Sequence, residues 1–196
     1  VTVGGSEAID LCIRAFVNPG EEVLIPEPSF VAYSPIVTLT SGVPVPIKTE
    51  AKDKFRLTAK QLEEAITEKT KILVLPFPNN PTGAVMRREH LEEIAEVIKK
   101  HNIIVLSDEI YAELTYGQHH VSMANITDMY ERTIVVNGFS KSHAMTGWRI
   151  GYAAGPEAII DRMSKMQENF NSGANAAAQY AAVYALEHRE LTDGIR

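Results

Sequence analysis

The sequence predicts an α/β domain of three layers, in which a mostly parallel sheet with one antiparallel strand carries helices on both faces. Short apolar runs rich in β-branched residues alternate with amphipathic segments, which is typical of strands joined by covering helices. Polar residues follow three of the predicted strands directly. The connection between residues 136 and 150 contains no clear crossover helix, which is compatible with an antiparallel neighbour.

The first half of the chain alternates helices and strands. The pattern predicts a helix over residues 6–17, a strand over 22–25, a helix over 30–40, a strand over 43–47 and a buried strand over 71–75. A Pro19-Gly20 turn precedes the first strand. Thr58 and Gln61 form a capping box that begins a short helix. A proline-rich loop follows the strand at 71–75 and continues to Gly83.

The second half contains three further strands. Apolar residues at helical spacing indicate a helix over residues 87–101. Strands are predicted over residues 103–107, 133–136 and 150–154. Pro156 then begins a helix at a favoured first-turn position, and an alanine-rich helix follows over residues 174–186.

Polar residues at the strand ends indicate where a ligand binds. Asn80, Asp108 and Lys141 each follow a different predicted strand. Ligands of parallel α/β sheets lie beyond the carboxyl ends of the strands, so we expect these three side chains to meet at one edge. Arg149 precedes its strand instead. It reaches the same edge only if the strand at 150–154 runs antiparallel to its neighbour.

Composition limits the classes of function. The chain has 196 residues, enough for one sizeable domain, with 45% apolar and 22% charged residues. A net charge of −6 gives no sign of a nucleic-acid or anionic-membrane partner. The longest apolar runs are too short to span a bilayer. The single cysteine, Cys12, excludes an internal disulfide, and a cytoplasmic location is expected.

Two adjacent histidines raise the question of a metal site. His119 and His120 lack the carboxylate or cysteine spacing that usually accompanies a metal centre. We interpret the pair as part of a surface loop and expect no metal ion.

Lys141 and Arg149 together indicate the chemistry of the ligand. An amine can form a Schiff base with a carbonyl, and a guanidinium can hold a phosphate with two parallel hydrogen bonds. The two residues lie eight positions apart. Pyridoxal 5′-phosphate carries both a carbonyl and a phosphate, and is therefore a ligand that suits this pair.

Four segments resemble the class I/II aminotransferases, which are fold type I pyridoxal-phosphate enzymes. Residues 138–151 resemble the cofactor attachment site, and residues 3–8 resemble the phosphate loop. The Asn-Pro-Thr-Gly loop at 80–83 and the Ser-Asp-Glu-Ile-Tyr segment at 107–111 are similar to two further landmarks of the family. They occur in family order across almost the whole chain, and residues 138–151 are most similar to the branch containing many aspartate aminotransferases.

The resemblance implies catalytic roles for three residues. Lys141 would hold the cofactor as a Schiff base and, once freed, would carry the proton from the substrate Cα. Asp108 would keep the ring nitrogen protonated, so that the ring acts as an electron sink. Tyr111, with Asn80, would donate hydrogen bonds to the phenolic oxygen of the ring.

The phosphate would be held at the start of the first helix. Gly5, Ser6 and Glu7 offer free backbone N–H groups and a favourable helix dipole. Arg149 supplies the cation. Many family members carry a serine three residues before the lysine, whereas this chain has Gly138, and Ser140 or Ser142 is the candidate substitute.

Apolar residues would cover the two faces of the ring. Phe30 resembles the stacking aromatic residue on one face, and Ile110 resembles the aliphatic residue on the other. A role in the hydrophobic core is the competing interpretation for both. Tyr33 fits either the core or the site.

The resemblance also implies a larger protein. Residues 1–196 would form most of the large pyridoxal-phosphate-binding domain, without the family's N-terminal arm and C-terminal small domain. The chain would then carry cofactor ligands without a complete substrate site. The full-length protein is expected to form a homodimer, and its partners are expected to be an amino acid and a 2-oxo acid.

Transamination, with an aspartate-like or broad range of amino acids, is the function that the resemblance favours. A C–S lyase or a decarboxylase on the same scaffold would use the same cofactor residues. A third alternative is a non-catalytic sensor domain of a transcription regulator that binds the cofactor.

Overall fold

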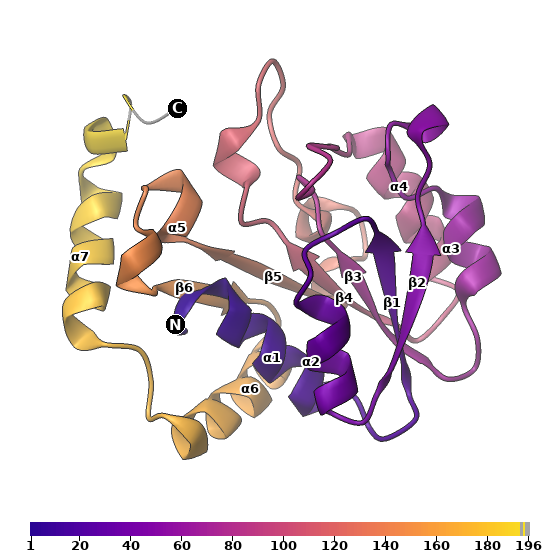
Figure 1. Cartoon of the computed structure of the whole chain (residues 1–196), viewed down its shortest axis with the longest axis horizontal. Coiled ribbons are helices and arrows are strands. Elements are labelled where there is room, and N and C mark those ends of the chain that lie inside the picture. Colours follow the sequence, from indigo (N-terminus) through magenta and orange to yellow (C-terminus); the bar gives the residue numbers. More distant parts are fainter. Residues whose placement is uncertain (193, 195–196) are drawn as a thin grey trace.

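A six-stranded sheet in the order β2-β1-β3-β4-β5-β6 crosses the centre of the protein (Figure 1). It is seen in a computed structural model that describes residues 1–192 and 194. The strands are β1 Glu22–Glu27, β2 Val43–Lys48, β3 Thr70–Leu75, β4 Ile104–Asp108, β5 Thr133–Gly138 and β6 Gly151–Ala154. Neighbouring strands are parallel except for the antiparallel pair of β5 and β6, as predicted.

Helices cover both faces of this sheet. Helices α1 Gly4–Phe16, α2 Tyr33–Leu39 and α6 Glu157–Phe170 pack on one face, and α3 Ala59–Ala65 and α4 Arg88–Ile98 on the other. Helices α5 Phe139–Ser142 and α7 Ala176–Glu187 pack against each other beside the sheet (Figure 1). Side chains alternate between the faces along each strand. In β3, Ile72 and Val74 pack into a cluster with α1, α2 and α6, whereas Leu73 and Leu75 pack with α3 and α4. The predicted three-layer α/β class is therefore confirmed.

Most predicted elements form, with shifted ends. The capping box before α3 is present, since Thr58 Oγ accepts from the Gln61 backbone N–H (3.3 Å) and Gln61 Oε1 accepts from the Thr58 N–H (3.1 Å). Helix α2 begins at Tyr33 and not at Phe30, because the chain first makes a turn in which Tyr33 N–H bonds the Phe30 carbonyl. Pro156 is the N-cap residue of α6, which begins at Glu157, so the proline lies one residue before the first turn in which it was predicted.

The start of α1 is held against the antiparallel strand pair. Thr2 exchanges two backbone hydrogen bonds with Gly151 of β6, of 2.8 and 3.0 Å. A Cβ on Gly151 would lie 2.7 Å from the carbonyl carbon of Gly4, and a Cβ on Gly138 would lie 2.9 Å from the Gly151 Cα. Glycine at these positions therefore lets the helix end approach the carboxyl end of β5.

No helix within residues 1–192 and 194 combines the length and the apolar character that a membrane crossing requires.

Candidate functional site

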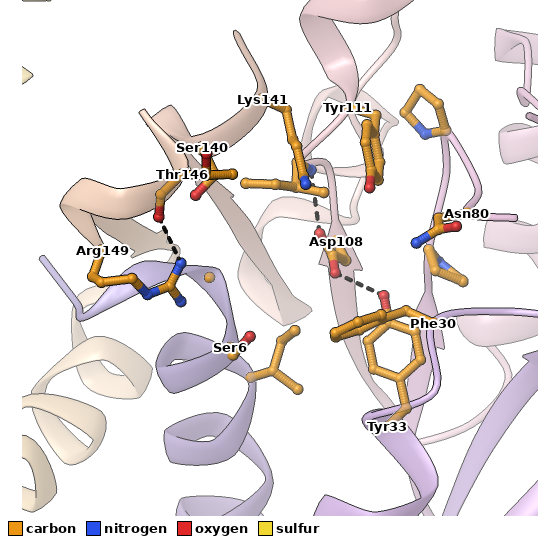
Figure 2. A pocket seen from close by; sticks show the side chains of 15 residues that line it. Ser6, Phe30, Tyr33, Asn80, Asp108, Tyr111, Ser140, Lys141, Thr146 and Arg149 are labelled. Atoms are coloured by element: carbon orange, nitrogen blue, oxygen red, sulfur yellow. Dashed lines mark hydrogen bonds between the residues drawn. The ribbon is translucent and has the colours of Figure 1, made fainter. Parts of the chain in front are cut away.

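A cavity of about 250 Å³ opens at the edge of the sheet where β3, β4 and β5 end (Figure 2). Its lining includes Gly5, Ser6, Phe30, Asn80, Asp108, Ile110, Tyr111, Ser140, Lys141 and Arg149, which are the predicted site residues apart from Glu7. In Figure 2, Arg149 lies on one side of the cavity and Asn80 on the other, with Lys141 and Asp108 between them. The chain thus brings together residues from five separate segments, at 5–6, 30, 80, 108–111 and 140–149.

Asp108 supplies a buried carboxylate at the end of β4. The residue is 6% exposed, and Oδ2 accepts a hydrogen bond of 2.7 Å from the hydroxyl of Tyr33. Oδ1 accepts a bond of 3.2 Å from the backbone N–H of Ile110. Burial raises the pKa of Asp108, while these two hydrogen bonds favour the charged form and act in the opposite direction. The carboxylate is therefore oriented by two donors in a site of low polarity.

Tyr33 also lines the cavity, whereas the sequence left undecided whether it belongs to the core or to the site. The residue is 2% exposed, and its ring meets that of Phe30 edge-on with centroids 5.7 Å apart. Burial and the charge of Asp108 both raise the pKa of Tyr33, so its hydroxyl remains a donor. A buried tyrosine hydroxyl needs a polar partner. This requirement is the one indication in the sequence that Tyr33, if buried, would turn its hydroxyl toward the polar site.

Lys141 and Tyr111 face each other across the upper part of the cavity. The Nζ atom of Lys141, on the short helix α5, lies 5.7 Å from the centre of the Tyr111 ring. Both side chains point into the cavity in Figure 2, and the Asn80 amide approaches from the loop after β3. The amine thus shares the cavity with two polar groups that could orient a ligand.

The neighbouring Asn79 shapes the loop that presents Asn80. The buried Asn79 Oδ1 accepts hydrogen bonds from the backbone N–H (3.2 Å) and the hydroxyl (2.8 Å) of Thr82. Its backbone N–H bonds the carbonyl of Ala84 (2.9 Å). Asn79 is therefore engaged within the loop, which leaves Asn80 to line the cavity.

A candidate anion site lies where Arg149 meets the start of α1. A Cβ on Gly4 would lie 2.5 Å from Arg149 Nη2, so the guanidinium rests directly against the first residue of the helix. The one hydrogen bond that Arg149 makes within the described part of the chain runs from Nη1 to the Thr146 carbonyl (3.1 Å). Free N–H groups of a first helical turn and a nearby cation together favour a phosphate.

The structure places Glu7, Ser140 and Ser142 differently relative to the cavity. The Glu7 side chain lies outside the cavity lining, because its carboxylate accepts hydrogen bonds from Val3 N–H (2.6 Å) and Gln167 Nε2 (3.0 Å). Of the two candidate serines, only Ser140 lines the cavity. Ser142 is buried, and its Oγ donates to the Gly138 carbonyl (3.2 Å).

Four further lining residues were not predicted from the sequence: Ile9, Pro76, Pro78 and Thr146. Their residue types are common in loops and cores, and no chemical signal distinguished them.

His119 and His120 lie in the same loop but differ in burial. His119 is exposed, whereas His120 Nε2 lies 2.8 Å from a carboxylate oxygen of the buried Glu109. Among the residues that the structure describes, no group of three or more histidine, cysteine, aspartate or glutamate side chains could hold a metal ion.

Comparison with known proteins agrees with this geometry. Residues 1–194 match the family described as aminotransferase class I and II. The chain belongs to this family. A putative aminotransferase, YugH, of Bacillus subtilis is 53% identical over 188 residues, which are 96% of this chain and 49% of that protein. An aspartate aminotransferase of Pyrococcus abyssi is 46% identical over 187 residues, which are 95% of this chain and 48% of that protein.

Solved aminotransferases share the fold as well. The crystal structure of an aromatic aminotransferase from Pyrococcus horikoshii superposes with a TM-score of 0.95 at 44% identity, covering 99% of this chain and 52% of that one. The chain therefore spans about half the length of the relatives that it matches.

Class I and II aminotransferases depend on pyridoxal phosphate, and the cavity has the donor set that this cofactor requires. An anion site, an amine and a buried carboxylate lie around one cavity. A side chain on Gly4 would collide with Arg149, so the helix end stays open beside the guanidinium. The residues present thus fit a ligand with a phosphate at one end, a carbonyl near Lys141 and a ring nitrogen near Asp108.

Proposed function

We propose that the protein is a pyridoxal-phosphate-dependent aminotransferase that moves an amino group between an amino acid and a 2-oxo acid. The observation that carries the proposal is the meeting of three side chains in one cavity, although Lys141 lies on α5, Asp108 at the end of β4 and Arg149 just before β6. Relatives named aspartate and aromatic aminotransferases support an aspartate-like or broad range of substrates.

The cofactor, when bound, supplies a conjugated ring that accepts the electrons left on the substrate Cα when a proton is removed. Lys141 would hold it covalently through its amine and then move the proton at the substrate Cα. Asp108, held by Tyr33, would keep a proton on the ring nitrogen. Tyr111 and Asn80 would donate hydrogen bonds to the phenolic oxygen.

The other residues of the cavity would bind and orient. Arg149, Ser140 and the backbone N–H groups of Gly5, Ser6 and Glu7 would hold the phosphate. Phe30 and Ile110 would cover the two ring faces and exclude water. This division is supported by the lining of the cavity, which contains all of these residues except Glu7, whose contribution would come from the backbone alone.

The proposal includes parts of the protein that this chain does not represent. Residues 1–196 would be most of the large domain, and the substrate site would be completed by an N-terminal arm, a C-terminal small domain and a second subunit of a homodimer. That the residues would form only part of a longer protein is supported by the match, which covers about half of each relative. A cytoplasmic location stays a prediction.

The substrate reaction gives the test. The full-length protein, loaded with pyridoxal phosphate, is mixed with aspartate and other amino acids, and the cofactor absorbance and the released products are followed. We expect conversion of the cofactor to its amine form with release of a 2-oxo acid. Ammonia and pyruvate from cysteine-type substrates would favour a C–S lyase, carbon dioxide a decarboxylase, and binding without product a sensor domain.

A further inference from the structure

Glu109 lies next to Asp108 but faces away from the cavity. Successive side chains of a strand alternate between its faces, so Glu109 shares a face with Ser107. The Glu109 residue is 4% exposed. A buried carboxylate requires donors, and three side chains supply them.

The three donors come from both sides of a loop. Glu109 Oε1 accepts hydrogen bonds from Ser107 Oγ (3.0 Å) and Ser122 Oγ (2.7 Å), and Oε2 lies 2.8 Å from His120 Nε2. An ionised carboxylate accepts hydrogen bonds, so a His120 ring that carries a proton on Nε2 donates to it. The carboxylate therefore joins the end of β4 to the returning segment at 120–122 and closes the loop formed by residues 110–119.

Both ends of this closure are anchored in the fold. The backbone N–H of Glu109 donates to the carbonyl of Val136 in β5 (2.8 Å). On the returning side, Ser122 Oγ also accepts from the Ala124 N–H (3.2 Å) at the start of the 3-10 helix Met123–Asn125. Met123 is buried in the core. The closure therefore connects two segments that are each held by the fold, the end of β4 and the start of the 3-10 helix Met123–Asn125.

Two proposed cofactor residues lie in this loop directly after Glu109. Ile110 and Tyr111 line the cavity, and the backbone N–H of Ile110 orients the Asp108 carboxylate. The carbonyl of Glu109 accepts from the Ala112 N–H (2.9 Å), so the turn that carries Ile110 and Tyr111 begins at Glu109 itself. A change in the position of Glu109 would move both neighbours.

We propose that Glu109 and His120 are positioning residues that fix Ile110 and Tyr111 at the cavity by closing the base of the 110–119 loop. Neither side chain lines the cavity, so both act through Tyr111, Ile110 and the hydrogen bond to Asp108. This role rests on the proposed function, because it concerns residues assigned there to the cofactor. This proposal assigns a positioning role to His120, which the sequence predicted to lie in a surface loop.

The test compares neighbouring histidines in the full-length protein. His120→Ala removes the donor, His120→Gln offers an N–H in its place, and His119→Ala changes an exposed histidine as the control. We expect His120→Ala to shift the absorption and circular dichroism of the bound cofactor and to lower kcat by about 10- to 100-fold, because misplaced site groups lose rate of this order. His120→Gln should recover part of both, and His119→Ala should match the unchanged protein.

Hydrogen exchange in the cofactor-free protein separates this inference from the proposed function. His120→Ala should speed exchange of the amides at 110–114 at least severalfold, while His119→Ala should not. If the unchanged protein formed no covalent cofactor complex, the proposed function would fail and this readout would still test the closure. Unchanged amide exchange in the His120→Ala protein would overturn the positioning role. The role would also be overturned if His120→Ala lowered stability but left the cofactor spectrum and kcat unchanged.

Discussion

Replacing Tyr33 with phenylalanine removes one hydroxyl from the interior of the site. In the native protein this hydroxyl donates a 2.7 Å hydrogen bond to Asp108, and both residues are buried. A hydrogen bond to a charged group contributes about 1.5–3 kcal/mol, whereas one between neutral groups contributes about 0.5–1.5 kcal/mol. The loss of stability in Tyr33→Phe should therefore depend on whether Asp108 is ionised.

The direction of the pH dependence follows from the pKa of Asp108. Burial raises this pKa, and the Tyr33 hydrogen bond opposes that increase. For a group with a raised native pKa, the stability it contributes is complete below the unfolded pKa and is lost as the pH rises through the native pKa. Tyr33→Phe raises the native pKa further, so its free energy of unfolding should fall more at neutral pH than in acid.

The assay is denaturant unfolding of the cofactor-free protein at about pH 7 and at about pH 4, the second close to the ordinary pKa of aspartate, from which burial raises the pKa of Asp108. We expect a loss of about 1.5–3 kcal/mol at neutral pH and a smaller loss in acid. Tyr180→Phe, which removes a hydroxyl from a side chain 79% exposed on α7, is the control and should change little. Equal losses at the two pH values would refute the assignment of Tyr33 as a donor to the Asp108 carboxylate.

Two further substitutions test the backbone contact and the anion site. Gly138→Ser would place a Cβ 2.9 Å from the Gly151 Cα and the Ile150 carbonyl oxygen. We expect its free energy of unfolding, measured with denaturant, to fall by at least about 1–3 kcal/mol. The control Gly147→Ser adds a side chain in open space and should change the free energy of unfolding little. A Gly138→Ser protein of normal stability would contradict the close approach of β5 and β6. Arg149→Ala should weaken cofactor binding about 10- to 100-fold, measured by titration calorimetry, because a charge-assisted contact is lost. Unchanged affinity would remove Arg149 from the phosphate site.

The sheet and the main site residues were predictable because they depend on local patterns. Apolar runs gave the strands, and the position of Arg149 before its strand required β6 to be antiparallel, which the structure confirms. Asn80, Asp108 and Lys141 meet because the ends of parallel strands share an edge. These inferences need only the order of elements along the chain.

Other features depend on contacts between distant segments, which no local pattern records. The hydrogen bond from Tyr33 to Asp108 spans 75 positions, and the Glu7 carboxylate is held by Gln167 of α6. His120 was interpreted as part of a surface loop because no carboxylate or cysteine spacing accompanies it, and the sequence did not show that its ring pairs with the buried Glu109. The absence of a serine at Gly138 also became explicable only when its distance to Gly151 was known.

Covalent attachment at Lys141 is the central claim, and chemical trapping tests it most directly. The full-length protein is incubated with pyridoxal phosphate, reduced with borohydride, digested and mapped by mass spectrometry. We expect the added cofactor mass on Lys141, its loss in Lys141→Ala, and its retention in Lys165→Ala, which changes an exposed lysine of α6. Attachment at another lysine, or none in the unchanged protein, would contradict the account.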